Sequence, residues 1–333
     1  MKPQTGSSGS YQPGLSILVM HYNRPWCLEV TLHLLNLARS KSPCPTEIIL
    51  ADDGSDPAVL PHFSKFPCDQ VYVQPNHSHN PGSYSIFSTF QAALSLAKYD
   101  HLLFVEDDFW LVPQGFHDVG KNHGEGLLSC PDFKHAPQTI NGALDLLRAD
   151  ESAHFVELAR GFTNSRYPSD HTTNTVYEGV HFQRKLHRPD DAWYICAWPH
   201  LARTAEVAAT TLPLGESPWH GERTLTNTRR QKYGTGDWVW NPHLCYFVHM
   251  NIYTWRENQK NEYQGDAAGN LKWMEADTTD VLPKPFTAVR NFNQKLLKKY
   301  LAGSLPNDLD ALTHTSILNY ATKFHFLKLI NDL

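Results

Sequence analysis

Residues 102–109 read Leu-Leu-Phe-Val-Glu-Asp-Asp-Phe, so that an apolar run ends directly in three consecutive carboxylates. Such a run predicts a strand that is buried on both faces, as in a parallel sheet. Ligands of parallel sheets bind beyond the carboxyl ends of the strands, which is where Glu106, Asp107 and Asp108 are expected. Adjacent carboxylates repel one another unless a cation or hydrogen-bond donors compensate, and their hard oxygens suit Mg²⁺ or Mn²⁺. A solvated acidic turn is the alternative interpretation.

The same pattern occurs upstream, about one βαβ unit earlier in the chain. Residues 47–56 read Glu-Ile-Ile-Leu-Ala-Asp-Asp-Gly-Ser-Asp, an apolar strand that ends in two carboxylates and a Gly-Ser turn. A third apolar run, at residues 15–20, is followed by Pro25 in a position typical of a first helical turn, and apolar residues recur behind it at helical spacing. A further helix is expected after Gly82 and Ser83. The alternation predicts an α/β fold of the nucleotide-binding type.

The length and composition of the chain limit its domain organisation, its partners and its cellular compartment. A chain of 333 residues can form one large α/β domain with an elaborated second half, or two domains that share a cleft. The net charge of −5 disfavours nucleic acid as a main partner. The six cysteines show no CxxC spacing, which predicts reduced thiols and a cytoplasmic location. No run reaches the roughly 20 apolar residues that a membrane-spanning helix requires.

We expect four segments along the chain. Residues 1–14 are rich in Gly, Ser, Pro and Gln and predict a disordered tail. Residues 15–112 and 113–260 are expected to form the two halves of one domain, and residues 261–333 a C-terminal extension. Within the second half, residues 140–161 predict a helix, and residues 190–203 an aromatic strand followed by a helix. The amphipathic stretch 316–333 predicts a helix packed on the body or on a second subunit of a homodimer, or else a peripheral membrane contact.

The order of these motifs resembles the nucleotide-sugar half of a GT-A fold glycosyltransferase and is most similar to glycosyltransferase family 2. The resemblance covers residues 15–112 and is carried by Ser16–Arg24, Asp52–Ser55, the Gly-Ser helix start and Glu106–Asp108. It implies that residues 15–112 are the nucleotide-sugar-binding half and residues 113–260 the acceptor-binding and catalytic half of the same domain. It also implies an α/β fold with a mixed, mostly parallel sheet flanked by helices, and a DXD position whose last acid, Asp108, binds Mn²⁺ or Mg²⁺ bridging a diphosphate. The nucleotide-binding residues expected on this basis are His21, Tyr22, Asn23, Arg24, Asp52, Asp53, Gly82, Ser83, Glu106 and Asp107.

The hydrogen-bonding pattern of the bases limits which nucleotide the donor can carry. A carboxylate at Asp52 or Asp53 can accept a hydrogen bond from the imide N–H of uracil or thymine, or from guanine, whereas cytosine and adenine lack that pattern. This favours a UDP, dTDP or GDP donor, with UDP first. Tyr22 can stack on the base and Arg24 can contact phosphate, while a strand-end core aromatic is the alternative role for Tyr22.

The catalytic base is expected in the second half. The stretch that begins at Gly221 resembles the Gly-Glu-Asp helix start of family 2 enzymes, but Arg223 stands where the family usually has an acid. An inverting transfer needs a carboxylate that takes the proton from the attacking hydroxyl, and Glu222 is the first choice, with Asp237 and Glu216 in reserve. The alternative is that Glu222 is only a capping charge at a helix start.

Further ligands are expected near the end of this half. His249 follows an apolar run, and in the resembled folds a late histidine at this place completes the metal shell; a buried structural histidine is the alternative. Aromatic rings bind the apolar faces of sugars, so Trp219 and Trp198 are acceptor-site candidates, although most tryptophans are core residues.

Taken together, these features predict a metal-dependent, inverting glycosyltransferase that moves a sugar from a nucleotide diphosphate donor to a hydroxyl of a glycan or glycoconjugate. Two alternatives remain. A nucleotidyltransferase would use related acids but usually has a Gly-rich phosphate loop, where this chain has His-Tyr-Asn-Arg-Pro. A catalytically silent nucleotide-sugar or glycan-binding protein would account for Arg223.

Overall fold

The computed structural model describes residues 11–74, 85–107, 109–116, 136–158, 171–185, 199–209, 228–229, 231–233, 239–242 and 245–249. In this part of the chain, Cys27, Cys44 and Cys68 are free thiols, as expected. None of the described helices has the length and apolar character needed to cross a membrane. The predicted helix at 316–333 and the whole extension 261–333 lie outside the described residues, as does the aromatic strand expected within 190–198.

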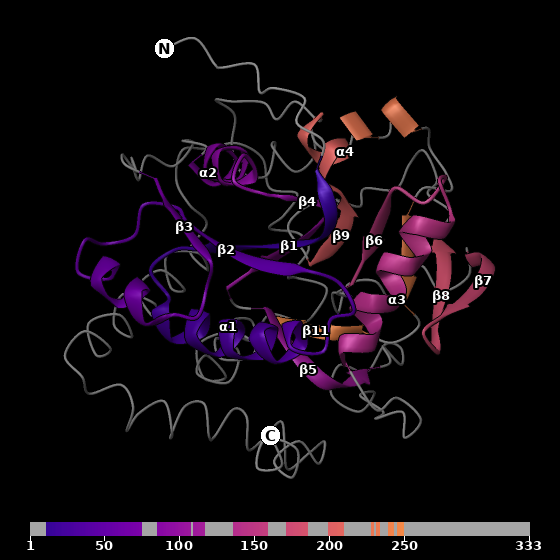
Figure 1. Ribbon diagram of the computed structural model, residues 1–333, viewed down its shortest axis with the longest axis horizontal. Helices are drawn as coiled ribbons and strands as arrows, with labels where there is room; N and C mark the ends of the chain where they lie inside the picture. Colours follow the sequence, from indigo (N-terminus) through magenta and orange to yellow (C-terminus); the bar gives the residue numbers. More distant parts are fainter. Residues whose placement is uncertain are drawn as a thin grey trace, which may run out of the picture.

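The described chain alternates strands and helices around one large sheet (Figure 1). The strands are β1 (Gln12–His21), β2 (Thr46–Asp52), β3 (Gln70–Val73), β4 (Tyr99–Glu106), β5 (Phe109–Phe116), β6 (Phe155–Glu157), β7 (His171–Tyr177), β8 (Val180–Lys185), β9 (His200–Arg203), β10 (Val239–Pro242) and β11 (Cys245–His249). The helices are α1 (Pro25–Arg39), the 3₁₀ helix η1 (Leu60–Lys65), α2 (Ser85–Leu94), α3 (Ala136–Ala149) and α4 (Thr204–Ala208).

Nine of the described strands form a mixed sheet in the order β3-β2-β1-β4-β9-β6-β10-β8-β7, while β11 pairs with β5 separately. The pairings between β3, β2, β1 and β4 are all parallel. Antiparallel pairing reverses β9 and β8 with respect to the other strands. The predicted α/β class with a mixed, mostly parallel sheet is therefore confirmed.

Two hydrophobic layers cover the sheet because alternate residues of a strand face opposite sides. On one face, Ile17 and Val19 of β1 pack with α1 and α3; on the other, Leu18 and Met20 pack with α2 and α4. In Figure 1, α1 and α3 accordingly lie on the side of the sheet opposite to α2 and α4. Helix α1 starts with a proline, as predicted, and buries Leu28, Leu32 and Leu35 completely at helical spacing.

The strand order creates a switch point between β1 and β4. From β1 the chain passes through α1 to β2 and on to β3 on one side, whereas β4 pairs with β1 on the other side. The registers place His21 beside Asp52 and Met20 beside Glu106, so the three strands end at one edge. Ligands of open α/β sheets bind at such a point, in the crevice beyond the carboxyl ends of the strands.

Four expected boundaries need correction. The helix expected over 140–161 ends at Ala149, and Phe155–Glu157 form strand β6. A turn separates them because the Asp150 carboxylate accepts hydrogen bonds from the Ser152 N–H and hydroxyl. Residues 12–14, expected in the tail, belong to β1, and the expected division at 112/113 falls inside β5. His200–Arg203, expected in a helix, are strand β9.

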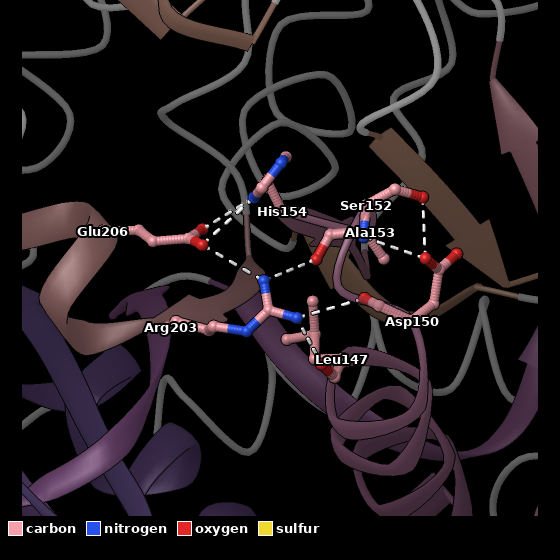
Figure 2. Close-up of polar contacts among 7 residues, drawn as sticks. All are labelled: Leu147, Asp150, Ser152, Ala153, His154, Arg203 and Glu206. Atoms are coloured by element: carbon pink, nitrogen blue, oxygen red, sulfur yellow. Dashed lines mark hydrogen bonds and ion pairs between the residues drawn. The ribbon is translucent and has the colours of Figure 1, made fainter.

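Arg203 ties the end of α3 to the sheet, as Figure 2 shows. Its guanidinium donates to the carbonyl oxygens of Ala153 at 2.9 Å and Asp150 at 3.0 Å, and also to that of Leu147. It donates further to the Glu206 carboxylate at 3.1 Å. The last carbonyls of a helix have no partners within the helix, and a cation there complements the helix dipole. Arg203 thus joins α3, β6 and α4.

Near this cluster, the buried His101 makes stability depend on pH. Burial lowers the pKa of His101 from 6.5, with Arg148 and Arg203 acting in the same direction and Asp100, whose Oδ1 lies 2.8 Å from the His101 Nδ1, opposing them. The folded state therefore binds this proton less readily than the unfolded state. The contribution of neutral His101 to the free energy of unfolding is fully present above pH 6.5 and is lost as the pH falls below it. We expect His101→Phe to flatten the fall in free energy of unfolding between about pH 7 and pH 5, measured by urea titration.

His33, exposed on α1, provides the control: His33→Phe should keep the wild-type slope. Equal slopes in the wild type and His101→Phe would contradict the prediction.

Candidate nucleotide and metal site

The loop after β1 is fixed to the turn after β2. Asn23 adopts a left-handed conformation with φ of 52°, which asparagine tolerates better than most residues. Its N–H donates to the Ser55 hydroxyl at 2.9 Å, and its side-chain Oδ1 accepts from the Asp56 N–H at 2.7 Å. The Asn23 side chain therefore holds these two loops together.

Asp52 shapes the Asp-Asp-Gly-Ser turn from within. The residue is fully buried, and its two carboxylate oxygens accept from the Ser55 N–H at 2.9 Å and the Ser55 hydroxyl at 2.5 Å. Gly54 takes the positive φ of 75° that lets the chain turn back. This is the local hydrogen bonding by which aspartate stabilises turns. The Asp-x-Gly-Ser order was the signal for it.

Asp107 is the centre of a buried charge cluster. It is fully buried, its Oδ2 lies 2.7 Å from His21 Nδ1, and its Oδ1 forms an ion pair with the guanidinium of Arg24. The backbone carbonyl of Asp107 accepts from the Thr31 hydroxyl of α1 at 2.5 Å. Buried charges require such partners because an unpaired one is costly to remove from water. The cluster joins the ends of β1 and β4 to the start of α1.

The structure shows which partners His21, Asn23, Asp52 and Asp107 have within the protein. The sheet registers put His21 and Asp52 on the α1 face, where they are buried together with Asp107, whereas Asn23 is half-buried. Two backbone hydrogen bonds of 2.9 Å, from Asp53 N to His21 O and from Asp107 N to Met20 O, also join the strand ends. Contact of these four residues with a nucleotide stays a prediction.

Asp53 belongs to the opposite, α2 side. Its Oδ1 accepts a hydrogen bond of 2.7 Å from the hydroxyl of Thr89, which is fully buried in α2. Sequence reasoning missed Thr89; the available signal was a threonine at helical spacing from the apolar Ile86 and Ala93. Tyr22, Arg24 and Glu106 are only half-buried, so they remain candidates for contact with a ligand.

The start of α1 is suited to an anion. No side chain caps this helix and no acidic residue stands in its first turn, while Arg24 occupies the capping position. The partial positive charge of a helix N-terminus favours phosphate groups, and it lies here directly after β1, at the switch point.

Pairing between β5 and β11 gives the backbone position of His249, one of the two expected metal ligands. His249 is the register partner of Phe109, and Phe109 follows Asp108 in the chain. Residues that face each other across two strands lie about 5 Å apart, and neighbouring Cα atoms about 3.8 Å apart. A carboxylate and an imidazole are both ligands that Mn²⁺ accepts, so the residue types Asp108 and His249 are compatible with a divalent cation, and their role as its ligands stays a prediction. Within the described ranges, no group of three or more His, Cys, Asp or Glu side chains could by itself hold a metal.

Several expected site residues lie outside the described part of the chain. They are Gly82, Ser83, Asp108, Trp198, Glu216, Trp219, Glu222 and Asp237. Their roles stay predictions.

Comparisons with known proteins place the chain beside several solved structures. Residues 1–349 of S. aureus TarS give a TM-score of 0.44 at 16% identity, covering 90% of this chain and 83% of that one. Mycobacterium tuberculosis glucosyl-3-phosphoglycerate synthase, in complex with Mn²⁺, UDP and phosphoglyceric acid, gives 0.45 at 14% identity, covering 79% and 74%. Mannosyl-3-phosphoglycerate synthase from Rubrobacter xylanophilus gives 0.43 at 17% identity, covering 68% and 64%. A longer TarS structure matches over 42% of its own length. No family model and no curated protein matches.

The strand order and the registers define an α/β protein whose strands β2 and β4 end in acidic residues beside β1 at a switch point, the place where open α/β sheets bind ligands. His21, Arg24 and Asp107 are bonded to one another there, on the α1 face of the sheet.

Proposed function

We propose that the chain is a metal-dependent glycosyltransferase of the GT-A type, similar to glycosyltransferase family 2. It transfers a sugar from a nucleotide diphosphate donor, with UDP favoured, to a hydroxyl of a glycan or glycoconjugate. The observation that carries the proposal is the register of β11 on β5, which puts His249 opposite the neighbour of Asp108 at the acidic end of β4.

In this proposal Asp108 and His249 hold Mn²⁺ or Mg²⁺. A nucleotide diphosphate is strongly anionic, so an acidic site would need such a cation to bind it, and the chemistry that the cation would supply is positive charge for the departing diphosphate. The start of α1 and Arg24 supply further positive charge for the same group.

The nucleoside would lie over the ends of β1 and β2. Tyr22 would stack on the base, and Asp53, held by Thr89, would accept the imide N–H of uracil. Glu106 and the Gly82-Ser83 helix start would contact the ribose and ordered water. His21, Asn23, Asp52 and Asp107 keep these groups in place from below.

Glu222 would act as the base of an inverting transfer. It would take the proton of the acceptor hydroxyl as that oxygen attacks the anomeric carbon and the diphosphate leaves from the opposite face. Asp237 and Glu216 are the reserve candidates. Trp219 and Trp198 would pack on the apolar faces of the acceptor sugar.

A thermal-shift panel tests the donor and the metal together. We expect UDP to raise the melting temperature only when Mn²⁺ is present, because a ligand of the native state stabilises it by mass action. Loss of even an outer-shell partner lowers metal affinity about 10- to 100-fold, so His249→Ala should raise the Mn²⁺ concentration needed for a half-maximal shift by at least about tenfold.

The exposed His181 of β8 is the matched control, and His181→Ala should behave as the wild type. Absence of a shift for UDP, GDP and dTDP would contradict the transferase and favour a glycan-binding protein.

A further inference from the structure

A column of stacked planar side chains crosses the α2 face of the sheet. The rings of Phe104 in β4 and His200 in β9 are 5.1 Å apart and inclined by 22°, and those of His200 and Phe155 in β6 are 4.3 Å apart and inclined by 26°. The guanidinium of Arg229 lies 4.9 Å above the Phe155 ring. The column thus runs from the strand that carries the acids to a short helical stretch, residues 228–229 and 231–233, which we call the Arg229 segment.

The Arg229 segment makes a second stacking contact beside the first. Tyr233 stacks on His154, with ring centroids 4.0 Å apart and planes inclined by 19°. Because Arg229 and Tyr233 are four positions apart, they share one face of the helical turn, and their partners Phe155 and His154 are neighbours in the chain. One face of the segment is therefore seated on the start of β6.

The partner surface is itself held in place. His154 Nδ1 lies 3.0 Å from Glu206 Oε1, and the same oxygen accepts from Arg203, which ties the end of α3 (Figure 2). Arg229 is only 4% exposed. An aliphatic side chain would fill this position without the cost of burying a cation. The arginine, stacked on Phe155, therefore indicates that the Arg229 segment has a defined orientation on β6.

The column also reaches strand β4, whose carboxyl end carries the acidic residues. Phe104 pairs in register with His200 and precedes Glu106 by two residues on the same face of the sheet. In the chain, Glu222 precedes Thr228 by six positions, a span of at most about 20 Å even when fully extended. Fixing the Arg229 segment therefore restricts where Glu222 can be.

We propose that Arg229 and Tyr233 are positioning residues, which seat the Arg229 segment on Phe155 and His154 and thereby keep the catalytic carboxylate within reach of the crevice. This inference rests on the proposed function. It assigns these two residues to the chemical step and not to donor binding, because the donor site is built from β1, β2 and β4.

The test compares Arg229→Ala and Tyr233→Ala with the wild type in the full-length chain. Three quantities are measured: the affinity for UDP with Mn²⁺, the kcat and KM for UDP release from UDP-sugar, and hydrogen exchange of the peptide that covers residues 228–233. A displacement of about 1 Å can cost about 100-fold in rate, so we expect kcat to fall by about that factor while UDP affinity changes less than about twofold. Exchange at 228–233 should become faster.

Tyr233→Phe retains the stacked ring and should restore kcat, which a loss of general stability would not allow. Gln231→Ala, at an exposed position of the same segment, should match the wild type. Unchanged kcat in both alanine variants, or unchanged hydrogen exchange at residues 228–233, overturns the inference. If the wild type nevertheless binds UDP in the presence of Mn²⁺, the proposed function is not affected by that result. A wild type that neither binds UDP nor releases it from UDP-sugars overturns both.

Discussion

Glu222→Gln is expected to lower kcat by about 100- to 10,000-fold, the range that general acid–base catalysis contributes. Glutamine has the same shape but cannot take the proton from the acceptor hydroxyl. The donor site is built from other residues, so affinity for UDP with Mn²⁺ should stay at the wild-type value. Release of UDP from a panel of UDP-sugars measures the first quantity, and calorimetric titration with UDP and Mn²⁺ measures the second.

Glu151→Gln, in the exposed turn after α3, is the control and should keep full turnover. If Glu222→Gln retains turnover, the base is not Glu222. Asp237→Asn and Glu216→Gln, measured in the same way, would then decide between the two reserve candidates.

Asp107→Asn is expected to reduce the free energy of unfolding by about 3–5 kcal/mol, the usual cost of breaking a buried ion pair from one side. The variant leaves Arg24 and His21 facing a neutral amide, and the Asp107 side chain is fully buried. Urea denaturation of wild type and variant at one pH gives the difference.

Asp145→Asn is the matched control, because Asp145 also pairs with an arginine, Arg148, but at the surface and at 3.5 Å. An exposed pair of this kind contributes at most about 1 kcal/mol. If instead Asp107→Asn keeps its stability and loses Mn²⁺-dependent UDP binding, Asp107 contacts the donor directly, as the sequence alone had suggested.

The fold could be predicted from local patterns wherever these were strong. The apolar runs of β1, β2 and β4 and the leucines of α1 gave the correct elements, because burial on both faces or on one stripe leaves a periodic signal. The end of α3 could not be predicted in this way. The apolar residues of β6 continue a helical spacing, and only the Asp150 turn and the hydrogen bonds from Arg203 separate the two elements.

For the candidate site, too, some features could be predicted from the sequence and others depend on the tertiary structure. The sequence by itself determined that carboxylates follow β2 and β4 and that the loop after β1 stands beside them, because residue order and the parallel sheet are enough for that. It could not determine on which face of the sheet each carboxylate lies: the registers put Asp52 on the α1 face, where Asp107 is also bonded, whereas Asp53 is bonded to Thr89 on the α2 face. Tertiary structure alone decided that β11 pairs with β5, with His249 opposite Phe109, since two strands far apart in the chain pair only when the whole domain closes around them.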